Sequence, residues 1–361
     1  MKTVRFLAAT LALVSMPAFA QDTPSRDVGA ITDAVIEHHL IPSYERLGME
    51  IEILGADFAD LCAAPSAKAL ARTRASFANV VEGWSRISHV QFGPVVEENR
   101  YERLHFWPDR RGIGLRQART LVAGEDEALL APGALVAQSV AVQGLGAVEV
   151  VLFAAGADAM AAPPVDSYRC RYGRAVAAAM QKVVAEIADG WFDPDRYARL
   201  LRRPGPENPI YRDDDEVLAE YVGTLAHGFE TIRDRKLLPI LGANAGAAKP
   251  KLAAFWRSGL TLQALEAEFA GLANLLEVSG LGLALSEDDR WMAGSAMFEF
   301  RNAARTFGEL PDDLTEALTV TEARGKTTYL VILTRSLQRL IGENIASALG
   351  LTVGFSALDG D

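Results

Sequence analysis

The chain has 361 residues, half of them hydrophobic, and a formal net charge of −11. This length exceeds the usual size of a single hydrophobic core, so we expect two domains. An acidic chain repels the phosphates of nucleic acid and the headgroups of anionic membranes, and we expect neither as a partner.

Residues 1–20 have the pattern of a secretory signal peptide. Lys2 and Arg5 precede an apolar stretch over residues 6–16, and Ala18 and Ala20 supply small residues for cleavage. The apolar stretch is too short to span a membrane. The sequence therefore predicts a soluble exported protein, located in the periplasm of a bacterium. Removal of residues 1–20 changes the formal charge to −13.

Helical periodicity dominates the first half of the mature chain. One predicted helix has its apolar face repeating at steps of three and four, and Ser66 is placed to cap the start of the next helix. A third helix is expected over residues 132–155 and a fourth from Asp166. The apolar face of the first helix consists of Tyr44, Leu47, Ile51, Leu54, Phe58 and Leu61.

Four more helices are expected in the second half, near 214–238, 261–281, 286–307 and 326–349. Strand-like alternation with hairpin turns is not evident in the sequence. We therefore predict an all-α fold of two antiparallel four-helix bundles. Proline-rich and glycine-rich turns near residue 205 suggest domains over residues 21–205 and 206–361.

The chain has two cysteines, Cys62 and Cys170. An even number of cysteines in an oxidising compartment favours a disulfide, and the alternative is two buried free thiols. In an up-down-up-down bundle, the end of the first helix and the start of the fourth lie at the same pole. Cys62 and Cys170 occupy those two places, which favours the disulfide.

Glu149 is a charged residue within an otherwise apolar helical stretch, residues 142–153. A helix that is apolar on every side is expected to be buried, and a buried carboxylate needs a cation, a metal or several hydrogen-bond donors. The alternative to a functional site is a structural ion pair, for which Arg86 or Arg169 would be the cation. Gly144 and Gly146 in the same stretch indicate close approach of a ligand, or tight packing between helices.

Several short motifs occur in the order found in the imelysin-like family, also labelled peptidase family M75, and over most of the mature chain the sequence resembles that family. The family signature is Gly-x-His-x-x-Glu, and Gly144 and Glu149 match it, whereas Gly146 stands in place of the histidine. The other motifs are Leu61-Cys-Ala-Ala-Pro-Ser66, Trp84-Ser-Arg86, Gln91-Phe-Gly-Pro94 and Phe106-Trp-Pro-Asp109.

The resemblance implies a periplasmic protein of two helical bundles with a site near the signature motif, and a link to bacterial iron uptake. Iron or another metal is the cofactor it would imply, and components of an iron-uptake system are the partners. Because Gly146 removes the imidazole, the His/Glu pair at i and i+3 that could hold a metal is incomplete.

We therefore expect a non-enzymatic protein that binds a metal species, a small ligand or a partner between its bundles. Glu149 is the expected central group, with Arg86, Trp107 and Asp109 as neighbours and His105 as a further candidate. Trp107 and Asp109 could equally form a turn with a packed indole. The alternative function is a metal-dependent peptidase of the M75 type, although the zinc-peptidase motifs His-Glu-x-x-His and His-x-x-Glu-His are missing from the sequence.

Overall fold

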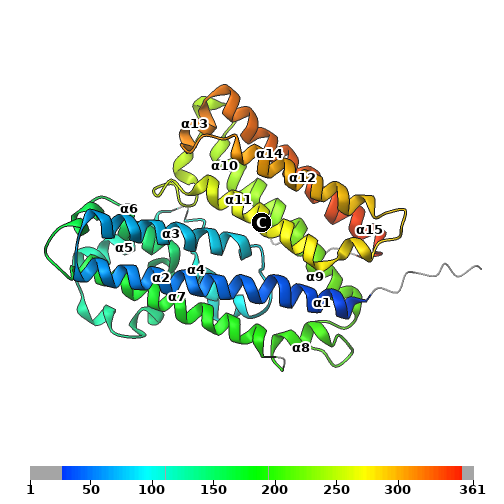
Figure 1. Cartoon of the computed structure of the whole chain (residues 1–361), viewed down its shortest axis with the longest axis horizontal. Helices are drawn as coiled ribbons and strands as arrows, with labels where there is room; N and C mark the ends of the chain where they lie inside the picture. The colour runs from blue at the N-terminus through cyan, green and yellow to red at the C-terminus, as the bar shows by residue number, and fades with distance from the viewer. Residues whose placement is uncertain (1–26, 110, 194, 352–361) are drawn as a thin grey trace, which may run out of the picture.

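The computed structural model describes residues 27–109, 111–193 and 195–351, so the predicted signal peptide lies outside the described residues. In this part of the chain all the regular elements are helices, which confirms the predicted all-α class (Figure 1). The α-helices are α1 (Val28–Val35), α2 (Ile41–Ala63), α3 (Ala67–Ile87), α4 (Arg100–Leu104), α5 (Ile113–Gly124), α6 (Gly144–Phe153), α7 (Tyr168–Phe192), α8 (Tyr197–Arg202), α9 (Asp214–Glu230), α10 (Leu238–Leu241), α11 (Thr261–Ser279), α12 (Trp291–Gly308), α13 (Leu314–Thr319), α14 (Thr321–Arg339) and α15 (Ala346–Ala348).

The first group of helices is built around α2, which packs against both α3 and α7 (Figure 1). All six residues of the apolar face predicted for this helix are buried, so the face forms the centre of the group. Ser66 caps α3 as predicted, since its side chain accepts a hydrogen bond from the backbone N–H of Ala69. Pro42 lies in the first turn of α2, directly after a π-helical segment, Ile36–Leu40 (η1), that joins α1 to α2.

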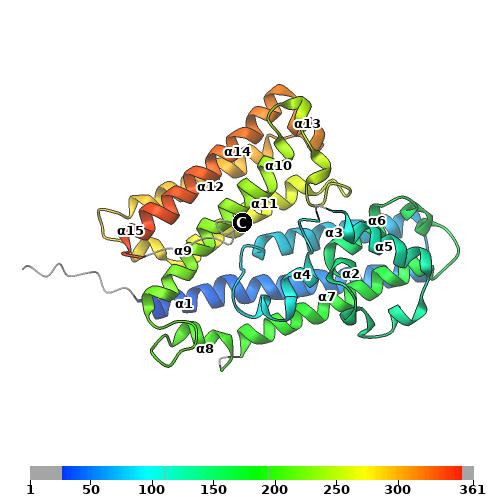
Figure 2. The same cartoon turned by 180° about the vertical axis from the view of Figure 1, so that it is seen from behind.

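The second group consists of α9, α11, α12 and α14, and α11 packs along α3 of the first group (Figure 2). In this group α12 packs on α11, and α14 packs on α9. A second π-helical segment, Thr231–Leu237 (η8), continues α9 towards α10. The two groups are consistent with two bundles, but the predicted boundary between residues 205 and 206 stays a prediction.

A disulfide joins Cys62 at the end of α2 to Cys170 in the first turn of α7, as predicted. The bond closes a loop with a sequence separation of 108 residues. It ties together the two helices that pack most extensively in the first group.

The predicted helix over residues 132–155 is wrong in its first half. Short 3₁₀ turns occupy Glu127–Leu130, Ala134–Ala137 and Val140–Val142, and the α-helix begins only at Gly144. Gly133 and Gly144 both have positive φ angles, of 81° and 69°, and such backbone conformations interrupt a right-handed helix. Across the described residues, none of the helices is long and apolar enough to cross a membrane.

Candidate functional site

Gly144 sets the position of α6 against the preceding chain. It adopts a φ of +69°, and a Cβ atom at this position would lie 2.3 Å from the carbonyl oxygen of Leu104. Only glycine fits such a close backbone contact without displacement. Gly144 therefore lies at the start of α6 rather than inside a helix, and it seats the helix against the end of α4.

Glu149 lies in the middle of α6 and is only 5% exposed. Its Oε1 atom accepts three hydrogen bonds from a loop in the second half of the chain. The donors are the backbone N–H of Arg257 at 3.2 Å, the backbone N–H of Ser258 at 3.1 Å and the Ser258 hydroxyl at 2.9 Å. The guanidinium of Arg257 lies 3.7 Å from Oε2. Glu149 thus fastens α6 to residues 257–258.

Burial raises the pKa of Glu149, and the hydrogen bonds from Ser258 and the positive charge of Arg257 oppose that rise. A buried carboxylate needs donors or a cation, and this carboxylate has both. The cation is Arg257, not the predicted Arg86 or Arg169. Arg86 pairs with Glu82, and Arg169 donates to the carbonyl oxygens of Val151 and Ala155.

Glu149 lines a cavity of about 590 Å³, which we call the α6 cavity. Its walls come from α6, from the segment between α4 and α5, and from residues 251–257 of the second half. This volume falls within the range of small-molecule sites. The α6 cavity is lined by His105, Phe106, Trp107, Pro108, Asp109, Gly112, Gly114, Leu115, Ala141, Gln143, Gly146, Glu149, Val150, Arg235, Pro239, Lys251, Leu252, Ala253, Ala254, Phe255, Trp256 and Arg257.

His105 stacks on the ring of Phe255 inside the α6 cavity, with ring centroids 4.7 Å apart and an angle of 14° between the planes. Burial, and to a smaller extent the nearby Lys236, lowers the pKa of His105 to about 3. The imidazole is therefore neutral near pH 7. Phe255 itself has a φ of +58°, which is strained for a bulky residue, and its buried ring packs against the rings of His105 and Phe77.

Trp107 and Asp109 also line the α6 cavity, as expected of neighbours of Glu149. Asp109 also lies in a turn, which is the other role considered for this segment. The carboxylate of Asp109 accepts hydrogen bonds from the backbone N–H groups of Ile113 and Gly114, so it caps the first turn of α5. The ring of Trp107 lies 5.6 Å from the Nζ atom of Lys236. Asp109 is therefore part of a turn, whereas Trp107 forms a wall of the cavity.

Gly146 faces the α6 cavity, and beyond its own chain neighbours and helix backbone no atom of the described residues lies within 4 Å of the position that its Cβ atom would take. Gly144 has the opposite environment and packs against backbone. Arg86 lies elsewhere, in a groove between α3, α11 and α12. Five of the seven predicted ligand-binding residues therefore line the α6 cavity, namely His105, Trp107, Asp109, Gly146 and Glu149.

Three cations of the α6 cavity were missed by the sequence analysis: Arg235, Lys251 and Arg257. The guanidinium of Arg257 lies 4.5 Å from the ring centroid of Trp256, and the ammonium of Lys251 lies 5.6 Å from it. The available signal was the run Phe255-Trp256-Arg257-Ser258-Gly259, which places two aromatic residues and a cation directly before a turn-forming serine and glycine. Over the described ranges, no cluster of three or more His, Cys, Asp or Glu side chains could hold a metal ion.

Fold and site together define an all-helical protein with a ligand-sized cavity whose central carboxylate joins distant parts of the chain. The family model for imelysin, the M75 peptidase family, matches residues 40–341. The chain therefore belongs to the imelysin family. No curated protein sequence matches it.

Two solved structures share the fold. An imelysin-like protein from Psychrobacter arcticum 273-4 is 18% identical, with a TM-score of 0.73 over 91% of this chain and 97% of that chain. A structure named as a putative iron-regulated protein A precursor, from Parabacteroides distasonis ATCC 8503, is 14% identical. Its TM-score is 0.73 over 89% of this chain and 96% of that chain. At these identities the likeness is one of fold.

Proposed function

We propose that the protein is an exported, non-enzymatic imelysin that binds a small anionic ligand in the α6 cavity. The observation that carries this proposal is the distribution of charge in the cavity. Both lining carboxylates, Asp109 and Glu149, already accept hydrogen bonds from backbone N–H groups. Within the part of the chain that the structure describes, neither Arg235 nor Lys251 has a carboxylate within ion-pair distance.

The aromatic walls favour a ligand with a planar or apolar portion. Trp256 lies beside two cations, so a ligand carboxylate can reach a positive charge while the rest of the molecule contacts the indole. Trp107 and the stacked His105–Phe255 pair provide further flat surfaces. Such sites combine apolar walls with a few charged groups that fix the orientation of the ligand.

In this proposal Glu149 is a positioning residue. It holds the backbone of Arg257 and Ser258 through three hydrogen bonds, and this fixes where the Arg257 side chain enters the cavity. Loss of the carboxylate would release the loop and change the place of that cation.

The proposed setting is iron acquisition in the periplasm, alongside components of an uptake system. It draws on family membership, on the N-terminal signal pattern and on the name of the iron-regulated relative. An anionic iron chelate supplies its own metal ligands, so a site of cations and aromatic rings can bind it without a protein-bound ion. Ferric citrate is a suitable probe, because it is both anionic and iron-loaded.

Isothermal titration of the purified mature protein with ferric citrate, and separately with citrate alone, tests this proposal. Lys251→Ala and Arg235→Ala should each weaken binding about tenfold, the usual effect of losing a charge-assisted contact worth about 1.4 kcal/mol. Lys249→Ala is the matched control, because Lys249 is exposed and does not line the cavity. Equal weakening in the control, or no binding of either probe by the wild type, contradicts the proposal.

The same purified protein can be tested for peptidase activity, which is the alternative function that the family name suggests. The proposal predicts that casein incubated with the protein stays intact with and without EDTA. Cleavage that EDTA abolishes would show that the protein is a metal-dependent peptidase.

A further inference from the structure

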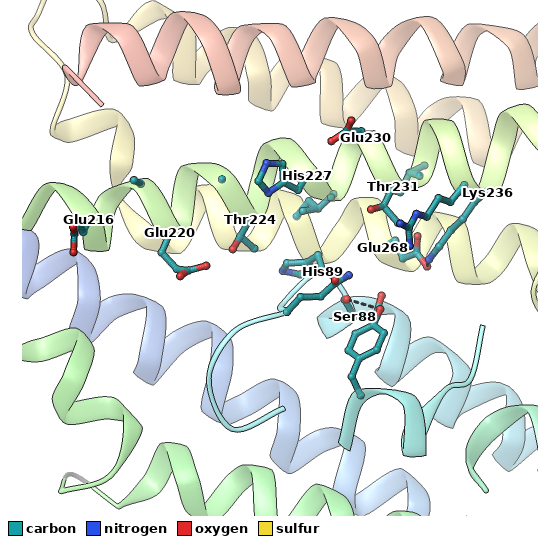
Figure 3. Close-up of a pocket in the computed structure, with 18 of the residues that line it drawn as sticks. Ser88, His89, Glu216, Glu220, Thr224, His227, Glu230, Thr231, Lys236 and Glu268 are labelled. Carbon is teal, nitrogen blue, oxygen red and sulfur yellow. Dashed lines mark hydrogen bonds and ion pairs between the residues drawn. The ribbon is translucent and has the colours of Figure 1, made fainter. Parts of the chain in front are cut away.

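A second cavity, of about 460 Å³, lies between α9, the residues that follow α3, and α11 (Figure 3). We call it the α9 cavity. Glu216 and Glu220 lie towards one end of it, whereas Lys236 and Glu268 lie together at the other end (Figure 3). His89 lies between the two ends, below Thr224 and His227 of α9.

His89 belongs to a row of three hydrogen-bonding side chains, of which His39 and His89 are buried and Asn274 is partly exposed. The Oδ1 atom of Asn274 lies 2.7 Å from Nδ1 of His39, and Nε2 of His39 lies 3.0 Å from Nε2 of His89. Both imidazoles are neutral near pH 7, because burial lowers the pKa of His39 to about 4 and that of His89 well below its usual value.

The order of donors in this row follows from the chemistry of its members. An amide oxygen only accepts, so His39 donates from Nδ1 and, being neutral, accepts at Nε2. His89 must then donate from Nε2, which leaves Nδ1 of His89 with a lone pair. This atom is buried, and none of the described residues forms a hydrogen bond with it; the side chain of His89 as a whole is only 9% exposed. An unused acceptor of this kind is costly unless a donor reaches it.

Glu220 supplies a second acceptor in the α9 cavity. Its carboxylate accepts a hydrogen bond from the hydroxyl of Tyr211 at 3.1 Å, and no Lys or Arg of the described chain pairs with it. The other cations of the cavity do not pair with Glu220 in the described chain, because Lys236 is bound to Glu268 and Arg235 lines both the α9 and the α6 cavity. The Glu220 end of the α9 cavity thus offers a carboxylate that has no Lys or Arg partner among the described residues, and His227 is the basic side chain that acts on it.

We propose that the α9 cavity, which His89 also lines, binds a small organic cation, an amine or a guanidinium compound, whose N–H groups donate to Glu220. Such a ligand supplies the positive charge and the hydrogen-bond donors that the acceptors lack. The aromatic rings of Tyr101 and Tyr211 line the same cavity and add favourable contacts with a cation. The site is distinct from the α6 cavity and takes the opposite charge.

Agmatine, which carries both an amine and a guanidinium group, is the probe for this proposal. Calorimetric titration should show a Kd below about 1 mM. Glu220→Gln keeps the shape of the side chain but removes its charge, and should weaken binding at least about tenfold. Ala219→Phe places a ring in the cavity from a partly exposed position of α9 and should abolish binding. Glu287→Gln, at an exposed position outside the cavity, should bind as the wild type does.

Circular dichroism identifies any variant that fails to fold, and Ala219→Phe then decides the question if Glu220→Gln is unstable. Titrations with butylammonium and with butylguanidinium show which group of agmatine the site recognises. The proposal is overturned if the wild type binds none of the three compounds. It is equally overturned if agmatine binds the folded Glu220→Gln and Ala219→Phe variants as tightly as it binds the wild type.

Discussion

Ser258 donates two hydrogen bonds to a single oxygen of Glu149, although the two residues are 109 positions apart in the chain. One bond comes from the backbone N–H and one from the hydroxyl. They connect α6 to the loop that brings Trp256 and Arg257 into the α6 cavity. The carboxylate of Glu149 therefore acts first as an anchor between distant segments.

Replacing Ser258 with Ala should lower the free energy of unfolding by about 1.5–3 kcal/mol, because a hydrogen bond to a charged group is lost inside the protein. Urea denaturation monitored by circular dichroism measures the change. Ser336→Ala is the control, since Ser336 is exposed on α14 and its loss should change stability by no more than about 0.5 kcal/mol. Equal stability of the Ser258→Ala variant and the wild type would mean that the hydroxyl contact contributes nothing.

The two glycines of α6, Gly144 and Gly146, should respond in opposite ways to alanine. Gly144→Ala should destabilise the protein by about 2–5 kcal/mol, because the new Cβ atom meets the carbonyl oxygen of Leu104 and the φ angle is unfavourable. Gly146→Ala should be neutral or stabilising by up to about 1 kcal/mol, because the position is helical and open. Thermal denaturation of both variants gives the comparison, and similar melting temperatures would contradict the distinction.

Removal of the disulfide should destabilise the fold substantially. Cys62 and Cys170 close a loop with a separation of 108 residues, and a cross-link over such a loop stabilises by up to about 4.7 kcal/mol through the unfolded chain. The double variant Cys62→Ser, Cys170→Ser should unfold at lower urea concentration than the wild type. Treating the wild type with a reductant should produce the same shift, and adding reductant to the double variant should produce none.

Local signals in the sequence were sufficient to predict most of the helices. The apolar repeat of α2 and the cap at Ser66 are both set by neighbours within a few turns, and both predictions are confirmed. The prediction of a helix over residues 132–155 is wrong in its first half, and this error has a local cause as well. Alanine-rich and valine-rich sequence favours a helix there, but the positive φ angles of Gly133 and Gly144 prevent a continuous helix, and α6 begins only at Gly144.

The hydrogen-bond donors and the cation that contact Glu149 could not be predicted from the spacing of residues in the sequence. Arg86 was chosen by its position on a nearby helix, whereas the actual cation, Arg257, lies in an irregular loop of the second half. Periodicity locates the face of a helix, but it carries no information about which distant loop meets that face. The burial of Glu149 was predictable because a lone charge stood in an apolar stretch, and its three donors were not.

The buried histidine row should make the protein sensitive to acid. Burial lowers the pKa of His39 to about 4, whereas the unfolded chain binds a proton at this residue near pH 6.5. The contribution of His39 to stability is therefore present above pH 6.5 and is lost as the pH falls from 6.5 towards 4. The loss approaches about 1.4 kcal/mol per pH unit in this range.

His39→Gln removes this titration, so the unfolding free energy of the variant should fall less steeply than that of the wild type between pH 6.5 and 4. Urea denaturation at several pH values measures the slope of the unfolding free energy against pH for both proteins. The two slopes should differ by the amount expected for one bound proton, about 1.4 kcal/mol per pH unit. The absolute stability of the variant should be lower near pH 7, because its contacts with Asn274 and His89 are disturbed. His38→Gln is the matched control, since His38 is the exposed neighbour of His39. If His38→Gln changes the slope as much as His39→Gln does, the acid sensitivity does not come from the buried row.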